Sequence, residues 1–159
     1  WPVNCLTCKD RAQIAFIHSG HDRDILMQLS QDADINRYTL RSYSEGAICV
    51  LRTPDTGLNP TAETLHQSLV LTPSQLIRDW PPQHFGELLP QHFDIFAELL
   101  PEVVLLGCGA QQRFLPPALL EHLARNGIPV ELMNTGAACR TYNILAGDGR
   151  NIAAALMMI

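Results

Sequence analysis

The sequence predicts a three-layer α/β fold with a mixed central sheet of about five strands and an N-terminal antiparallel hairpin. Over residues 103–159, short apolar runs alternate with amphipathic segments, which is typical of parallel strands joined by covering helices. Before them, residues 38–43 alternate apolar and polar side chains, and a Ser44-Glu45-Gly46 turn leads to the apolar run 47–51, which together indicate the hairpin. With 159 residues, 47% of them hydrophobic, the chain can bury one substantial core.

The N-terminal residues look different from the rest. Residues 1–26 have mixed polarity and precede Met27, after which a cleaner domain-like pattern begins. Because disorder concentrates at chain ends, we expect residues 1–26 to be a poorly ordered extension and residues 27–159 to be a single α/β domain.

One set of cysteines and histidines and a second set of histidines alone raise the question of metal binding. The extension contains the pattern C-x2-C-x9-H-x2-H, formed by Cys5, Cys8, His18 and His21. Zinc fingers usually have about twelve residues between the pairs and roughly three to five between the histidines, so both gaps are short for zinc. The other histidines are scattered along the chain: His66, His84, His92 and His122. We therefore expect no metal site and no cofactor.

A loop, a strand and a helix are expected after the hairpin. Residues 52–60 contain two prolines and a glycine and are predicted to be a loop, and residues 68–71 are predicted to be a strand that Pro73 ends. Apolar residues at i, i+3, i+4 and i+7 predict an amphipathic helix that Pro101 stops. These apolar positions are Phe93, Phe96, Ala97 and Leu100.

The second half contains three strands and two helices. The apolar runs 103–106, 130–133 and 152–159 predict buried strands, the first closed by Gly107 and Gly109. Pro117 opens a helix that runs to Arg125. Its predicted apolar side is formed by Leu115, Leu119, Leu120 and Leu123. A last helix is expected from an Asn134 or Thr135 cap to about Ala146.

Candidate ligand-binding residues gather where two of these strands end. Open α/β sheets bind ligands at the carboxyl ends of their strands, so the turns after residues 106 and 133 are expected to face one crevice. The first N–H groups of the following helix, at residues 136–138, and the charge of Arg140 would favour an anion there. The crevice candidates are Gly107, Cys108, Gly109, Asn134, Thr135, Gly136, Cys139, Arg140 and Asn143.

The alternative is that this junction is a structural corner. The glycines would then permit unusual backbone angles and close helix-to-sheet packing. Arg140 would pair with an acid such as Glu131 or Asp148.

Cys139 also has two interpretations. The positive end of the helix and nearby Arg140 would favour a reactive thiolate, whereas a free cysteine is usually buried as a small hydrophobe. The chain contains no G-x-S-x-G, H-E-x-x-H or G-x-x-x-x-G-K motif, and G-C-G-A-Q-Q lacks the last glycine of a dinucleotide fingerprint. We therefore assign no catalytic residue and favour a non-enzymatic function, with catalysis left open.

Trp80 and Phe85 are candidates for binding a protein partner. They flank a proline pair and would form an exposed apolar loop of the kind that marks partner surfaces. Packing over the edge of the core is the alternative, because tryptophan is usually largely buried.

Charge and hydropathy exclude several classes of partner. A net charge of -5 without a basic cluster argues against nucleic-acid binding. No run approaches the roughly 20 apolar residues of a membrane span, so direct membrane insertion is not expected. Five cysteines without an export signal favour reduced thiols, and we expect a cytoplasmic protein.

Two segments carry a family resemblance. They are L-G-C-G at residues 106–109 and ELMNTGAACRTYNIL at residues 131–145, followed by Gly149-Arg150. From Met27 onward the chain resembles the domain-of-unknown-function family that includes mitochondrial respiratory complex I assembly factor 3. The resemblance implies a three-layer α/β fold with a mixed five-stranded sheet, no established catalytic activity, and protein partners during assembly of a membrane enzyme.

Two hypotheses about function follow from the sequence. The favoured one is a non-enzymatic protein-binding module that assists assembly of a larger complex. The other is a small-molecule or anion-binding protein, or an enzyme, that uses the crevice at the strand ends.

Overall fold

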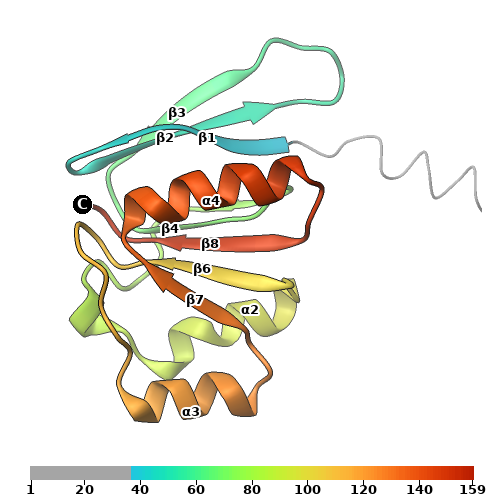
Figure 1. Ribbon diagram of the computed structural model, residues 1–159. Coiled ribbons are helices and arrows are strands. Elements are labelled where there is room, and N and C mark those ends of the chain that lie inside the picture. The colour runs from blue at the N-terminus through green and yellow to red at the C-terminus, as the bar shows by residue number, and fades with distance from the viewer. Residues whose placement is uncertain (1–36) are drawn as a thin grey trace, which may run out of the picture. The chain divides into compact units, whose positions relative to one another are not determined.

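The computed structural model describes residues 37–159, and a five-stranded sheet of order β5-β4-β8-β6-β7 runs through this part (Figure 1). Its strands are β4 (Leu69–Leu71), β5 (Leu76–Ile77), β6 (Val103–Gly107), β7 (Val130–Met133) and β8 (Ile152–Leu156). Strand β6 pairs in parallel with β7 and β8, whereas β4 is antiparallel to β8 and β5. The predicted mixed sheet is confirmed. The predicted extension, residues 1–26, and its cysteine-histidine pattern lie outside the described residues.

A second, antiparallel sheet has the order β1-β2-β3. It consists of β1 (Arg37–Ser44), β2 (Ala47–Thr53) and β3 (Thr61–Leu65). Strands β1 and β2 are the predicted hairpin. Strand β3 was not predicted, because its sequence TAETL is mostly exposed and polar and follows a proline.

The helices cover both faces of the five-stranded sheet. They are α2 (Asp94–Leu99), α3 (Pro117–Arg125) and α4 (Thr135–Gly147), with short 3-10 turns η2 (Phe85–Glu87) and η3 (Pro90–Phe93). Helices α2 and α3 cover one face, and α4 lies on the other, against β6, β8 and β1 (Figure 1). The predicted three layers are therefore present, and the small sheet packs beside α4.

The central strand β8 explains how layers form on both sides. Its sequence IAAAL is buried along its whole length, with Ala153 and Ala155 in the core under α2 and α3 and Ala154 in the core under α4. Short side chains there let helices approach the sheet from both faces. The buried face of helix α4 also consists of small or flat side chains, which recur every three to four residues. They include Ala138, Cys139, Tyr142 and Ala146.

The predicted apolar faces of two helices need correction. Phe93 and Phe96 are buried, but Ala97 is exposed and Leu100 is 74% exposed. The α-helix begins only at Asp94, after a 3-10 turn, and is six residues long, with Ile95 and Leu99 partly buried against the core. Leu100 takes a left-handed conformation (φ 45°) that ends the helix and turns its side chain from the core. On α3, Leu120 is likewise exposed.

Thr135 forms hydrogen bonds that connect the segments after three strands, and this junction of Thr135, Gly109 and Met157 is called the corner. Its hydroxyl accepts a hydrogen bond from the Gly109 N–H at 2.9 Å and donates one to the Met157 carbonyl at 2.7 Å. Its own N–H donates to the Gly109 carbonyl at 2.9 Å. Because Thr135 is fully buried, these bonds join the segments that follow β6, β7 and β8 without help from water.

Gly107 is required by the same corner. A Cβ atom at this position would lie 2.9 Å from the Thr135 hydroxyl oxygen, 3.0 Å from the Thr135 Cα and 3.1 Å from Leu156. The second of these atoms is backbone, so it cannot move aside without shifting α4.

We expect Thr135→Val to lower the free energy of unfolding by about 2 to 4 kcal/mol, because it keeps the shape but orphans a buried N–H and a buried carbonyl. Thr135→Ser retains the hydroxyl and should cost less than about 1.5 kcal/mol. Urea unfolding of the full chain measures both. Equal stability of the valine and serine variants would show that these hydrogen bonds do not hold the corner.

Candidate functional site

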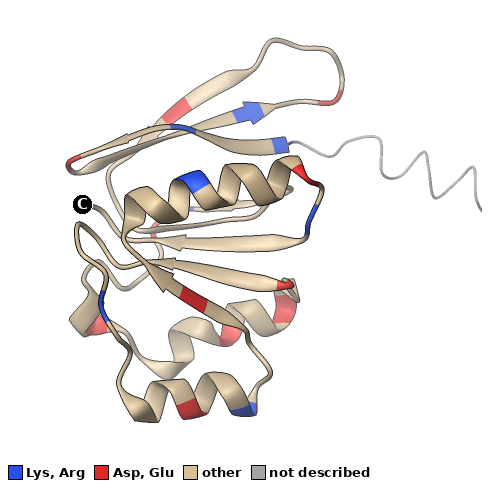
Figure 2. Cartoon of the chain, viewed as in Figure 1, with Lys and Arg blue, Asp and Glu red and all other residues tan. Residues whose placement is uncertain are grey.

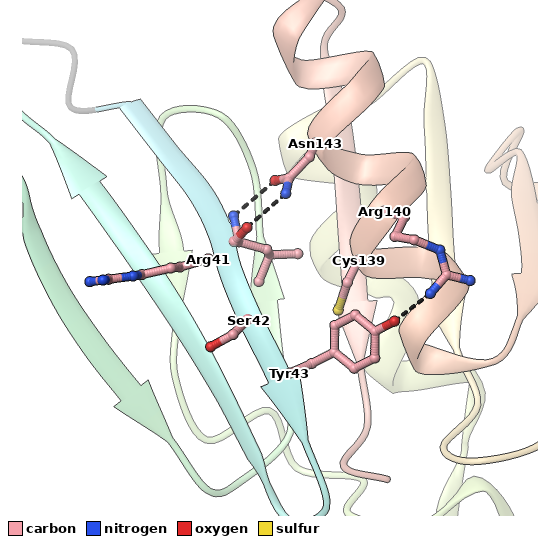
Figure 3. A pocket seen from close by; sticks show the side chains of 7 residues that line it. Arg41, Ser42, Tyr43, Cys139, Arg140 and Asn143 are labelled. Carbon is pink, nitrogen blue, oxygen red and sulfur yellow. Dashed lines mark hydrogen bonds between the residues drawn. The ribbon is translucent and has the colours of Figure 1, made fainter.

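A pocket of about 300 Å³ lies between β1 and α4 (Figure 3). It is lined by Leu40, Arg41, Ser42, Tyr43, Cys139, Arg140 and Asn143. Three of these residues, Cys139, Arg140 and Asn143, belong to the crevice candidates predicted from the sequence. The hairpin residues on the other wall were not predicted, because nothing local in the sequence indicates that β1 lies along α4.

Asn143 and Tyr142 attach the edge of β1 to α4. The Asn143 amide accepts a hydrogen bond from the Leu40 N–H at 2.9 Å and donates one to the Leu40 carbonyl at 2.7 Å (Figure 3). The Tyr142 hydroxyl donates to the Tyr38 carbonyl at 3.0 Å, and burial raises the pKa of this hydroxyl above its usual value. Side chains of α4 thus replace a neighbouring strand along the free edge of β1.

Arg140 and Tyr43 face each other across the pocket. The Arg140 Nη1 donates to the Tyr43 hydroxyl, and the guanidinium carbon lies 6.0 Å from the centre of the Tyr43 ring. The alternative pairing of Arg140 with Glu131 or Asp148 is wrong, since Arg140 forms no ion pair within residues 37–159.

The tyrosine ring also covers the start of α4. A Cβ atom at Gly136 would lie 2.8 Å from the Tyr43 ring, so only glycine leaves room for this ring. The Ala137 N–H donates to the Asn134 side chain at 2.7 Å, and the Ala138 N–H donates to the Asn134 carbonyl at 3.0 Å. Two of the three helix N–H groups expected to face an anion are therefore already bonded within the protein.

A β-bulge shapes the strand side of the pocket. The pairing of β1 with β2 shifts between Leu40 and Ser42, which leaves Arg41 as the extra residue. The side chains of Arg41 and Ser42 extend away from α4, and Tyr43 points toward it (Figure 3). Among the side chains drawn there, Arg140 supplies the positive charge that faces Tyr43.

The thiol of Cys139 is not activated. Burial raises its pKa from 9.0 to about 12, and the nearby Arg140 charge offsets only part of this effect. The effect of burial thus exceeds the positive field that favoured a thiolate in the sequence. Burial also raises the pKa of the Cys108 thiol. Both cysteines are free and buried, as the alternative interpretation of Cys139 expected.

A second pocket, of about 340 Å³, lies at the carboxyl ends of β6 and β8. It contains the candidates Cys108, Gly109 and Phe85, together with Arg113, whose guanidinium lies 5.9 Å from the centre of the Phe85 ring. The remaining lining residues are Gln83, His84, Gly86, Ala110, Met157 and Met158.

The structure has no single crevice between the two glycine turns of the described chain. Instead, one pocket lies between β1 and α4, and the other lies at the ends of β6 and β8. The two turns are adjacent, because β6 and β7 pair with Gly107 opposite Met133. Space between them is filled by the Thr135 hydroxyl, which lies in hydrogen-bond contact with Gly109. Gly107, Asn134, Thr135 and Gly136 line neither pocket.

Trp80 is part of the core and not of an exposed loop. It is 2% exposed, its indole N–H donates to the His92 carbonyl at 3.2 Å, and its ring meets Phe93 edge-on at 6.2 Å. The alternative, packing over the core, is therefore correct for Trp80. Phe85 is half-buried under Arg113 and keeps part of its ring accessible.

Within residues 37–159, no group of three or more histidine, cysteine or acidic side chains is placed to hold a metal ion. None of the helices in the described part of the chain has the length and apolar character needed to cross a bilayer.

The chain is similar to several known proteins. The chain is 32% identical over 103 residues to NADH dehydrogenase [ubiquinone] 1 alpha subcomplex assembly factor 3 of Danio rerio, which covers 64% of this chain and 59% of that protein. It is 34% identical over 61 residues to the 13 kDa major membrane protein of Francisella tularensis, covering 38% of this chain and 50% of that protein. The chain thus spans about half to three fifths of these relatives.

Solved structures match over a larger share of the chain. A crystal structure of a Bordetella parapertussis protein is 31% identical, with a TM-score of 0.64, and the match covers 77% of this chain and 97% of that one. A solution structure of a Bordetella pertussis protein described as a Mth938-like domain is 26% identical, with a TM-score of 0.59, over 76% of this chain and 85% of that one.

The family match includes the Thr135 corner and most residues of both pockets, with Leu40, Arg41 and Met158 just outside it. The family described as protein of unknown function (DUF498/DUF598) matches residues 42–157, which extend from the bulged strand β1 to the end of β8. The two segments that carried the resemblance, residues 106–109 and 131–145, both lie inside this range. The chain belongs to the DUF498/DUF598 family.

Proposed function

We propose that this protein is a non-enzymatic, protein-binding module that assists the assembly of a larger, membrane-associated complex. The observation that carries this proposal is the 32% identity over 103 residues to a protein named as an assembly factor of NADH dehydrogenase. Proteins of the same name from Bos taurus and Mus musculus are 33% identical over 85 and 90 residues.

The cysteine chemistry supports a function without a thiol nucleophile. A nucleophilic cysteine needs a lowered pKa and access to solvent. Cys108 and Cys139 have neither, since both are buried and burial raises the pKa of each thiol. Cys49, Cys108 and Cys139 are all unpaired, which agrees with the cytoplasm as the proposed location.

The alternative function loses the space it needed between the two glycine turns. A small molecule or anion between the Gly107-Gly109 turn and the Thr135-Gly136 turn would have to displace the buried Thr135 hydroxyl from two hydrogen bonds. Displacing that hydroxyl would open the corner that joins β6, β7 and β8.

The segment between β6 and α3 is the surface we propose for partner contact. Phe114 in this segment is 83% exposed, and its neighbour Arg113 lies over the half-buried ring of Phe85. Aromatic and arginine side chains are enriched among the residues that dominate binding energy at protein interfaces. Phe85 stays a candidate contact, and Phe114 takes the place that the sequence analysis gave to Trp80.

Affinity purification of the tagged full chain from its native cells tests this proposal. We expect specific partners to be recovered, and Phe114→Asp to reduce their recovery about tenfold, because interface aromatics often contribute more than 1 kcal/mol. Ile144→Asp is the matched control, since Ile144 is 65% exposed on α4, which lies on the other face of the sheet. Recovery of no partner above an untagged control, or equal loss in both variants, would contradict the proposal.

Thiol labelling tests the absence of an activated cysteine. We expect iodoacetamide to label Cys139 and Cys108 of the native chain slowly at neutral pH, with no rate plateau below pH 9, and to label both readily in urea. Peptide mapping by mass spectrometry reads each site. A rapid rate that saturates below pH 8 at either residue would indicate an accessible thiolate and reopen a catalytic function.

The raised pKa of the Cys139 thiol makes the free energy of unfolding depend on pH. Its thiol ionises near 9.0 when unfolded and near 12 when folded, so the unfolded chain binds fewer protons between these values. The contribution of Cys139 to the free energy of unfolding is therefore fully present below pH 9 and falls as the pH rises toward 12. Cys139→Ala should reduce this alkaline loss in pH-dependent urea unfolding, and an identical pH profile for both proteins would contradict the assignment.

A further inference from the structure

The pocket between β1 and α4 contains a positive charge that no acidic side chain neutralises. None of the seven lining residues is acidic, and Arg140 forms no ion pair among the described residues. Three other arginines differ in this respect, since Arg78, Arg125 and Arg150 each bind a glutamate. Figure 2 shows one basic segment along α4, whereas several acidic segments lie on α2, α3 and β7.

The guanidinium of Arg140 is held in position. One of its N–H groups donates to the Tyr43 hydroxyl, and the Tyr43 ring is in turn packed over Gly136. A guanidinium has five N–H donors in a planar fork, which matches the two oxygens of a carboxylate. The contact with Tyr43 uses one donor and leaves the others for a ligand.

The rest of the pocket is mostly apolar. Leu40 and Cys139 are buried beneath it, the Cys139 thiol stays protonated because burial raises its pKa, and the Tyr43 ring forms one side. A volume of about 300 Å³ is at the lower end of the range for ligand pockets, so it suits a ligand of a few carbons.

A single charge favours a monoanion over phosphate. The start of α4 adds little to anion binding here, because Tyr43 covers Gly136 and Asn134 accepts the bonds of Ala137 and Ala138. The side chains of Arg41 and Ser42 extend away from α4 (Figure 3). One guanidinium can balance one carboxylate, whereas a phosphate dianion would be only half neutralised.

We propose that this pocket binds a small organic monocarboxylate, with the carboxylate on the Arg140 guanidinium and the hydrocarbon part against Leu40 and Cys139. This inference goes beyond the proposed assembly function and does not depend on it. Partner recovery with Phe114 variants and ligand binding at Arg140 are measured separately, so either can fail alone.

Titration of the 15N-labelled full chain with butyrate tests the proposal. We expect saturable changes in the amide signals of residues 40–43 and 139–143, and none with butyramide, which has the same shape without the charge. Arg140→Gln should weaken butyrate binding at least about tenfold, the usual effect of losing a charge-assisted hydrogen bond. Tyr43→Phe should weaken it roughly fivefold, because the ring remains while the hydroxyl that positions Arg140 is lost.

Arg113→Gln is the matched control. Arg113 also lies over an aromatic ring in a pocket and forms no ion pair within residues 37–159, but it belongs to the pocket at the ends of β6 and β8. This variant should bind butyrate as the wild type does. Any of four results would overturn the proposal: no saturable change with butyrate, equal binding of butyramide, unchanged binding in Arg140→Gln, or saturable binding of inorganic phosphate without binding of butyrate.

Discussion

The buried hydroxyl of Thr135 joins three segments that are far apart in the sequence. It accepts from Gly109 after β6, donates to Met157 after β8, and stands at the first position of α4 after β7. A hydroxyl that serves as both donor and acceptor in a fully buried position cannot be exchanged for an apolar group without leaving both of its partners unbonded. The position of α4 over the sheet, and the packing of Gly107 directly beneath it, depend on this contact.

The closed corner explains why open space lies on either side of it. In an open α/β sheet a ligand usually binds between the carboxyl ends of neighbouring strands. Here the place between β6 and β7 is occupied by Thr135, and one pocket lies at the ends of β6 and β8 while the other lies between α4 and β1. The small sheet is attached to α4 through Asn143 and Tyr142, and the pocket between α4 and β1 lies beside this attachment, where β1 has its bulge.

Local pattern was sufficient to predict the elements whose burial is continuous or strictly periodic, such as β6, β8, α3 and α4. It failed for β3, which is polar and depends on β2 for its hydrogen bonds, and for the buried face of α2, which has only six residues and ends at the left-handed Leu100. Of the site, the sequence indicated Cys139, Arg140 and Asn143 because they lie on the predicted helix that begins where a buried strand ends. It could not indicate Tyr43, which is 97 residues from Arg140, nor the burial that raises the Cys139 pKa, because both result from tertiary packing.

The most direct test is native-state hydrogen exchange at the Gly109 amide, whose N–H donates to the Thr135 hydroxyl in the buried corner. If the corner is a fixed structural junction, this amide should open only with global unfolding, and its free energy of exchange should match that of amides in the central strand β8. Exchange of Gly109 that is fast, with a free energy close to that of the exposed β3 amides, would mean that the corner opens to solvent and would contradict the account.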